Sequence, residues 1–168
     1  ENGELQNFNL NAVFGVKLGS KNTLNFYTTF FESDRNSSGT ITSTSTAKLI
    51  DKNSRFLLDW KYLASRFTSS TKASYLLEKN TYFYDKNQFD YSVSESKRFV
   101  GKYDFTYFVS NNISFVAGAQ FDHTEGVGTN IANSTQNDFT SYFLFQHRPQ
   151  SRLNYNLSIR KGFSSAYE

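Results

Sequence analysis

The sequence is poor in three residue types: its 168 residues include no cysteine, no methionine and a single proline. Because methionine is absent, Glu1 is not a translation start, and we expect either a mature chain whose signal peptide has been removed or an internal part of a longer protein. The lack of cysteine is compatible with exposure to the periplasm but does not establish it.

Long apolar runs and strong net charge are also absent. No segment approaches the ~20 consecutive apolar residues of a membrane-spanning helix, which excludes a helical membrane protein. The formal net charge is only +3, and no basic block occurs, which argues against a nucleic-acid-binding protein.

Aromatic residues, in contrast, are abundant. Eleven Tyr and eighteen Phe dominate an aromatic content of 18%, whereas the mean hydropathy is −0.57. A soluble core seldom needs so many rings in so polar a chain. A transmembrane β-barrel produces this combination, because it has an outer apolar band with aromatic girdles and a polar interior.

Two segments near the end of the chain alternate clearly between apolar and polar residues. In Leu153–Arg160 the apolar members are Leu153, Tyr155, Leu157 and Ile159, and Asn154, Asn156, Ser158 and Arg160 lie between them. Residues 113–122 follow the same period of two. This period predicts β-strands with one apolar and one polar face, as required of a strand between lipid and a polar barrel interior.

The same alternation predicts eight strands in an all-β, antiparallel transmembrane β-barrel. The expected strands cover residues 5–18, 24 to about 33, 54–67, 72–85, 98–109, 113–122, 137–147 and 152–163. The fourth strand is ambiguous because Glu78 and Lys79 are adjacent, so that one of them must lie on the apolar face. A β-bulge or an exit from the bilayer near Glu78 would resolve this conflict.

The expected connections alternate in length. Short turns at 19–22, 68–71, 110–112 and 148–151 separate long polar loops at 34–53, 86–97 and 123–136, the first of which is able to form its own hairpin. Short turns at one rim and long extracellular loops at the other are typical of outer-membrane barrels. A strand of ~12 residues at ~3.3 Å each, tilted by ~45°, rises about 28 Å, which matches the ~25 Å apolar band.

Three stretches resemble the barrel of a TonB-dependent outer-membrane receptor, especially the forms common in Bacteroidetes. They are Phe99–Phe105, Val116–Asp122 and Leu153–Phe163 with the following Ser164–Glu168. The family pattern is broken at Gln120 and Ser164, which stand where arginine is usual. The proline that usually ends the last motif is absent or lies beyond the end of the sequence. The similarity covers about residues 54–168.

The resemblance implies a barrel of twenty-two strands that encloses an N-terminal plug domain. On this reading residues 1–168 form an internal barrel segment without the plug, in the outer membrane of a Gram-negative bacterium. The receptor would import a large scarce nutrient of the siderophore, cobalamin or oligosaccharide class. Its expected partners are outer-membrane lipid, the plug domain and TonB, and a surface lipoprotein is a further candidate partner.

Two other readings remain open at this stage. Eight strands in 168 residues also suit a complete small outer-membrane barrel, an anchor or adhesin in which residues 5–18 pair with 152–163. A soluble β-barrel or β-sandwich that binds a ligand also alternates, but with its apolar face turned inward.

The alternation also assigns individual side chains to the two faces. The candidates for a position facing the barrel lumen are Asp59, Lys61, Gln120, Asp122, Asn154, Asn156 and Arg160. The aromatic side chains expected to face lipid are Phe14, Phe26, Trp60, Tyr62, Phe105, Tyr107, Phe143 and Tyr155. Such outward rings fix the depth of a protein in the membrane.

Catalytic and metal-binding patterns are not apparent, so we expect neither an enzyme nor a cofactor. His123 lies beside Asp122 and Glu125, and a surface histidine of this kind more often belongs to a solvated rim than to a catalytic or metal site. Asp34, Asp122 and Glu125 could contribute to a calcium site, but their spacing matches no calcium-loop pattern.

Overall fold

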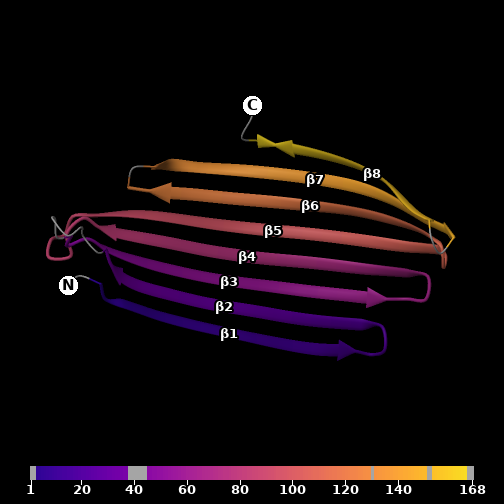
Figure 1. The fold of residues 1–168 in the computed structure, drawn as a ribbon, viewed down its shortest axis with the longest axis horizontal. Helices are drawn as coiled ribbons and strands as arrows, with labels where there is room; N and C mark the ends of the chain where they lie inside the picture. The colour runs from indigo at the N-terminus through magenta and orange to yellow at the C-terminus, as the bar shows by residue number, and fades with distance from the viewer. Residues whose placement is uncertain (1–2, 38–44, 130, 151–152, 166–168) are drawn as a thin grey trace.

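The protein forms one antiparallel sheet of eight strands, connected in chain order, in a computed structural model that describes residues 3–37, 45–129, 131–150 and 153–165. The strands are β1 Leu5–Leu18, β2 Asn22–Asn36, β3 Lys48–Leu63, β4 Phe67–Phe83, β5 Tyr91–Ser110, β6 Ile113–Gly128, β7 Ile131–Gln150 and β8 Leu153–Ser164. Each pairs with its neighbours along the chain, and all pairs are antiparallel (Figure 1). The all-β, antiparallel part of the expected fold is therefore confirmed.

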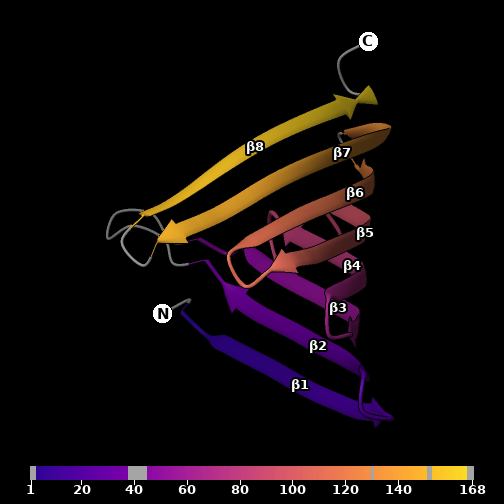
Figure 2. The same ribbon diagram turned by 90° about the vertical axis from the view of Figure 1, so that its right-hand side faces the viewer.

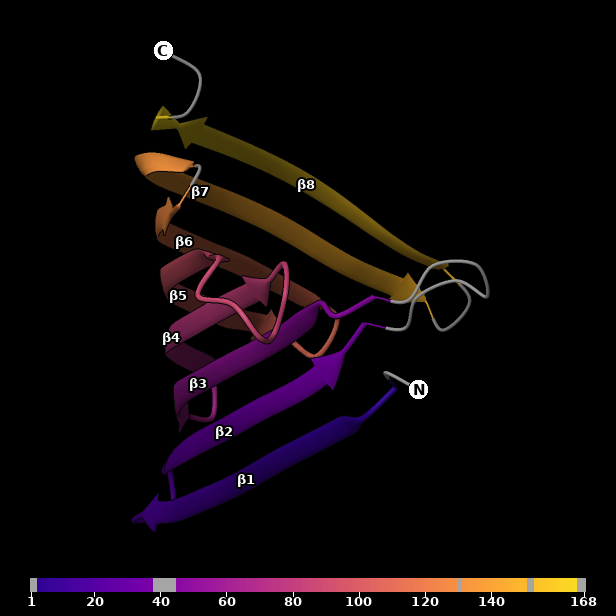
Figure 3. The same cartoon turned by 90° about the vertical axis from the view of Figure 1, so that its left-hand side faces the viewer.

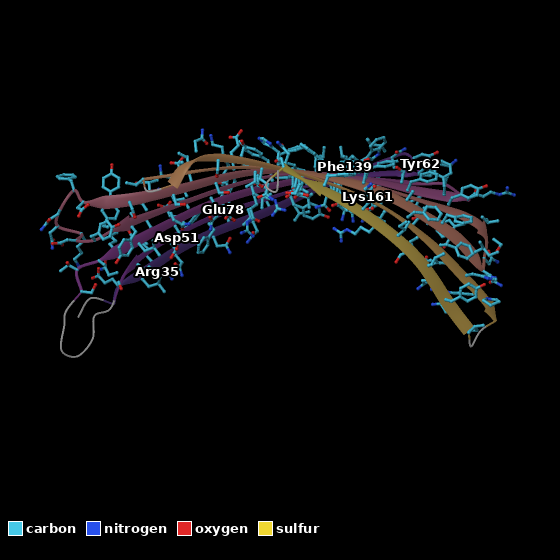
Figure 4. The ribbon with its side chains drawn as sticks, turned by 90° about the horizontal axis from the view of Figure 1, so that it is seen from above. Arg35, Asp51, Tyr62, Glu78, Phe139 and Lys161 are labelled. Atoms are coloured by element: carbon cyan, nitrogen blue, oxygen red, sulfur yellow. The ribbon has the colours of Figure 1, made fainter. Side chains whose placement is uncertain are left out.

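The sheet is open. Within the described ranges, β1 pairs only with β2 and β8 only with β7, so the two terminal strands form separate edges, which lie far apart in both side views (Figures 2 and 3). Viewed from above, the sheet is an arch, with Arg35, Asp51 and Glu78 on its concave side and Tyr62 and Phe139 on its convex side (Figure 4). A closed barrel is therefore not formed by the described residues.

The connections are shorter than the sequence predicted, because several strands continue into polar segments. The expected loop 34–53 begins within β2 and ends within β3, and residues 38–44 of it lie outside the described part of the chain. The expected loop 86–97 shrinks to residues 84–90. The expected loop 123–136 is wrong, since β6 and β7 leave only residues 129–130 between them. The expected alternation of short and long connections therefore fails at this third position.

Three further boundaries also differ from expectation. The predicted turn at 68–71 is wrong, because these residues belong to β4 and the chain reverses at 64–66. The predicted end of the third strand at residue 67 is wrong for the same reason. The predicted turn at 148–151 begins too early, since β7 continues to Gln150.

Gly19, with φ of 72°, supplies the left-handed residue of the β1–β2 turn.

β4 resolves the conflict between Glu78 and Lys79 without a β-bulge. Its pairing with β3 and β5 is continuous through both residues, so their side chains lie on opposite faces. The register instead shifts at three other places: between Phe108 and Ser110, between Gly126 and Gly128, and between His147 and Gln150.

The sheet is a single layer without a packed core. Ala47 is the only buried apolar residue in the described part of the chain, and no large side chain there is fully buried. Among the described residues, none forms a helix with the length and apolar character needed to cross a membrane.

Candidate functional site

The register separates the side chains into two faces. Residues that oppose each other in an antiparallel pair share a face, and successive residues alternate. By this rule Asp59, Lys61, Gln120, Asp122, Asn154, Asn156 and Arg160 all lie on one face, here called the polar face. The polar face carries Arg35, Asp51 and Glu78 and is the concave one (Figure 4). That these residues face a lumen stays a prediction.

The eight aromatic side chains expected to face lipid all lie on the opposite, apolar face: Phe14, Phe26, Trp60, Tyr62, Phe105, Tyr107, Phe143 and Tyr155. Six of them are exposed, with relative exposures from 37% for Phe26 to 65% for Phe14. The other two, Tyr62 and Phe105, are half-buried. Contiguous apolar surface of this kind marks an interaction surface. Contact with lipid also stays a prediction.

Neighbouring rings on the apolar face contact one another near the short turns. Phe67 lies 5.5 Å from Phe105 between ring centroids, and Phe115 lies 5.8 Å from Phe143. The Trp60 indole Nε1 donates a hydrogen bond of 3.0 Å to Asn22 Oδ1. A row of aromatic side chains therefore borders this end of the apolar face, and the polar N–H of the Trp60 indole has a hydrogen-bond acceptor there.

Ion pairs border the opposite end of the apolar face. Lys52 Nζ lies 2.8 Å from Glu32 Oε1, and Lys79 Nζ lies 2.6 Å from Glu95 Oε1. Together with Lys97, His123 and Glu125 on the same face, these residues are here called the ionic margin: Glu32, Lys52, Lys79, Glu95, Lys97, His123 and Glu125. The apolar face is thus bounded by rings at one end and by charges at the other.

His123 belongs to this margin, where it contacts residues of β6 and β7. Its Nδ1 lies 2.6 Å from Asn137 Oδ1 and its Nε2 lies 3.1 Å from Glu125 Oε1. Asp122 points to the other face, so the predicted neighbours do not converge. Across the described ranges no three His, Cys, Asp or Glu side chains could hold a metal ion together.

Asp34, the other acidic residue considered for calcium, lies apart from Asp122. Its carboxylate pairs with Lys48 Nζ at 2.7 Å, at the far end of the apolar face.

In the connection 84–90, the backbone N–H of Asn87 donates to Asp85 Oδ1 at 3.0 Å, and this bond lowers the pKa of Asp85.

A buried carboxylate organises the centre of the polar face. Asp122 is 7% exposed, and its Oδ1 accepts hydrogen bonds from Arg98 Nε at 3.2 Å and Nη2 at 2.5 Å. Gln120 Nε2 donates to the other oxygen, Oδ2, at 2.7 Å. Because both oxygens are satisfied, the group is held rigidly. Arg98, not predicted from the sequence, is half exposed.

A second network crosses three strands. The Tyr142 ring on β7 lies over Gly118 on β6, and its hydroxyl donates a hydrogen bond to Asp104 Oδ1 on β5. Lys102 Nζ completes the group, 3.2 Å from Asp104 Oδ2 and 5.8 Å from the Tyr142 ring centroid. Only glycine leaves room for this crossing, because a Cβ at position 118 would overlap the ring.

Asp59 is buried without full satisfaction. It is 4% exposed, and Lys61 Nζ lies 3.5 Å from its Oδ2, but its Oδ1 has no hydrogen-bond partner among the residues that the structure describes. Its direct cross-strand neighbours are Asn25 and Lys72. A buried carboxylate oxygen without a donor is costly, so this place favours an additional donor.

A shallow hollow on the polar face brings two predicted residues together. It lies over β5–β8, and its polar lining side chains are Lys102, Gln120, Thr140, Tyr142, Ser158 and Arg160. Two cations and several hydroxyl and amide groups suit a polar or anionic ligand. Lys102 and Tyr142 were missed as site residues, although both occupy polar positions in the period-two pattern.

The remaining predicted residues are not part of this hollow. Asn154 and Asn156 lie nearer the short turns, and Asp59 and Lys61 lie on β3. His147 is on the apolar face, where its Nδ1 lies 2.5 Å from the Tyr155 hydroxyl. Comparison with protein-family models and with curated proteins finds no match to this chain.

Proposed function

We propose that this chain forms part of the wall of an outer-membrane β-barrel in a TonB-dependent receptor. The observation that carries the proposal is that all seven polar candidates lie on one face and all eight aromatic candidates on the other, in an arched sheet whose polar face is concave. In a membrane barrel the convex face meets lipid and the concave face meets water, a plug or substrate. A soluble barrel requires the reverse arrangement, with apolar side chains inside.

The borders of the apolar face support this orientation. Aromatic rings such as Trp60 and Tyr62 lie toward one end, and the ionic margin, with Lys52 and Lys79, lies at the other. Rings of this kind concentrate at membrane–water interfaces. Charged side chains on the lipid face are least costly at the interfaces.

The open edges favour a barrel larger than eight strands. β1 and β8 each leave one row of backbone groups without a partner strand. Unpaired backbone groups cost several kcal/mol each in hydrocarbon, so both edges need a partner strand in a membrane, and further strands of a larger barrel would supply it. This requirement agrees with an internal segment of a large receptor barrel that encloses a plug domain.

In such a receptor the polar face would line the path of a large scarce nutrient of the siderophore, cobalamin or oligosaccharide class. The hollow with Lys102 and Arg160 offers hydrogen bonds and positive charge on that path. TonB would act through the plug, and this segment would supply the wall.

A complete small outer-membrane barrel, acting as an anchor or adhesin, is the second candidate. The number of strands, eight, favours it, because eight strands are enough to close a barrel filled with side chains. The mass of the intact mature protein separates the two: a value near 19.3 kDa favours the small barrel, and a several-fold larger value favours the receptor.

Spin labels test the orientation of the two faces in the intact protein. Single labels at Asn156 and Leu157, adjacent residues on opposite faces of β8, would be compared in outer-membrane vesicles. We expect the label at Leu157 to collide mainly with oxygen, which partitions into lipid, and the label at Asn156 mainly with a water-soluble nickel complex. Water exposure at both positions, or the reverse pattern, contradicts the proposal.

A further inference from the structure

Two lysines of the ionic margin face each other directly. Lys52 on β3 and Lys79 on β4 are cross-strand partners, and both lie on the apolar face. Like charges in directly opposed positions destabilise an antiparallel pair. The arrangement is therefore unfavourable unless other groups compensate for it.

The two ammonium groups turn away from each other toward the outer strands. Lys52 pairs with Glu32 on β2 at 2.8 Å, and Lys79 pairs with Glu95 on β5 at 2.6 Å. Both lysines remain about half exposed, with side-chain exposures of 57% and 49%. Because exposed pairs of this kind contribute little, the lysines can exchange these partners at low cost.

A hollow opens where the lysines separate. Ser54, Leu77 and Lys97 line it together with Lys52, Lys79 and Glu95. Lys97 is the direct partner of Leu77, and no carboxylate lies within ion-pair distance of its ammonium group in the described part of the chain. Three ammonium groups, the Ser54 hydroxyl and the Glu95 carboxylate therefore border the same space, so the cations outnumber the anion.

Apolar and aromatic surface continues from this hollow along the sheet. Leu77 forms part of the hollow. Two residues farther along each strand, toward the centre of the apolar face, Phe56, Tyr75 and Phe99 lie side by side on β3, β4 and β5. Tyr75 and Phe99 are each 40% exposed. A positively charged rim next to an exposed apolar surface matches a molecule with an anionic head and hydrocarbon tails.

We infer that this hollow binds the phosphate headgroup of a membrane lipid, with its acyl chains along Tyr75 and Phe99. A phosphate presents several acceptor oxygens, so one group can accept bonds from Lys52, Lys79 and Lys97 at once. It also places a negative charge between the opposed lysines. The inference rests on the proposed function, because it requires the apolar face to meet lipid.

Lipid retention tests the inference with the intact protein purified in a neutral detergent. The probes are dioleoyl phosphatidic acid, dioleoylglycerol, which lacks the phosphate, and inorganic phosphate, and bound lipid is counted by native mass spectrometry. We expect phosphatidic acid to bind at least about 10-fold more tightly than dioleoylglycerol, as expected for charge-assisted hydrogen bonds. Inorganic phosphate alone should neither bind measurably nor displace the lipid.

Charge-neutralising variants locate the site. The triple variant K52Q/K79Q/K97Q should lose the preference for phosphatidic acid, and K52R/K79R/K97R should keep it. The matched control K17Q/K21Q/K72Q removes the same charge at residues outside the ionic margin and should leave binding unchanged. Retained heat-modifiable migration on gels shows that each variant is folded.

Three outcomes would overturn the inference: an equal affinity for both lipids, an equal loss in the control variant, or displacement by inorganic phosphate. Its failure is distinguishable from failure of the proposed function. If the label at Leu157 lies in lipid while the triple variant binds normally, only the lipid site is wrong. If that label lies in water, both proposals are wrong.

Discussion

The contact between Gly118 and Tyr142 shows how a single missing side chain sustains a polar network. Gly118 lies between Asp104 and Tyr142 in the register, and the Tyr142 ring crosses it to reach Asp104. Glycine ordinarily weakens a strand. Here it permits a hydrogen bond between side chains two strands apart.

Gly118→Ala tests this role. The new Cβ would overlap the Tyr142 ring, so the ring must move and the hydrogen bond to Asp104 is lost, at a cost of about 1–3 kcal/mol. The free energy of unfolding, measured by urea titration in lipid vesicles, should fall accordingly.

Gly126→Ala is the matched control, on the same strand and the same face. A Cβ there would meet only Ser134 Oγ, at 3.6 Å, so stability should not fall. In the background Tyr142→Ala the substitution at Gly118 should also become harmless. An equal loss in both backgrounds would show that the ring contact is not the cause.

At the scale of single elements, β8 carries the clearest difference between its two faces. Leu157 and Ile159 are 72% and 70% exposed on the apolar face, and Asn156 and Arg160 alternate with them. Lys161 also lies on the apolar face, with its Nζ 4.9 Å above the Phe163 ring. The cation–π contact and the long side chain ease the cost of this charge.

Leu157→Arg and Asn156→Arg form a matched pair on β8. In lipid, Leu157→Arg should destabilise the protein by about 2–4 kcal/mol, as a charge does near the bilayer midplane, and Asn156→Arg should have a small effect. The yield of heat-modifiable protein in the outer membrane measures assembly. Equal tolerance at both positions would contradict the assignment of the faces.

The sequence predicted the faces of the elements better than their ends. Successive side chains of a β-strand point to opposite faces. The alternation of apolar and polar residues in segments such as Leu153–Arg160 was therefore enough to assign each candidate residue to one face of the sheet. The strand ends did not follow, because Asp51–Asn53 is polar on both faces and residues 123–136 are mostly polar or glycine, so that both segments resemble loops. Backbone pairing with the neighbouring strand, as between Lys52 and Glu32, continues the strands through these ends, and a partner strand cannot be recognised from local composition.

The polar networks were predictable only in part. Gln120 and Asp122 were identified from one strand, but their partner Arg98 lies on the neighbouring strand, and the register that joins them is not visible in either segment alone. The hollow near Arg160 likewise depends on three pairings between β5 and β8.

At the scale of the whole molecule, the separation of β1 and β8 distinguishes a segment of a larger barrel from a small closed one. Cysteine pairs can test it cleanly within this chain, which has no native cysteine. In the intact protein, A12C/I159C should form no intrachain disulfide, because the two strands lie at opposite edges. Bridging requires Cα atoms within about 7 Å.

The control pair A12C/T28C joins direct partners on β1 and β2 and should oxidise readily. Neighbouring registers, L10C/I159C and F14C/I159C, guard against a shifted pairing. Non-reducing gels and the mass of the linked peptides measure the result. Efficient bridging between β1 and β8 would support the small closed barrel instead.

The length of the strands has a consequence for how a ligand would first meet the protein. β5 and β7 contain 20 residues each, which at ~3.3 Å per residue and a tilt of ~45° rise about 47 Å, well beyond an apolar band of ~25 Å. In the proposed orientation, hydrogen-bonded hairpins would therefore stand above the bilayer as a stiff collar. An arriving molecule would encounter this preformed vestibule before any mobile loop had to fold around it.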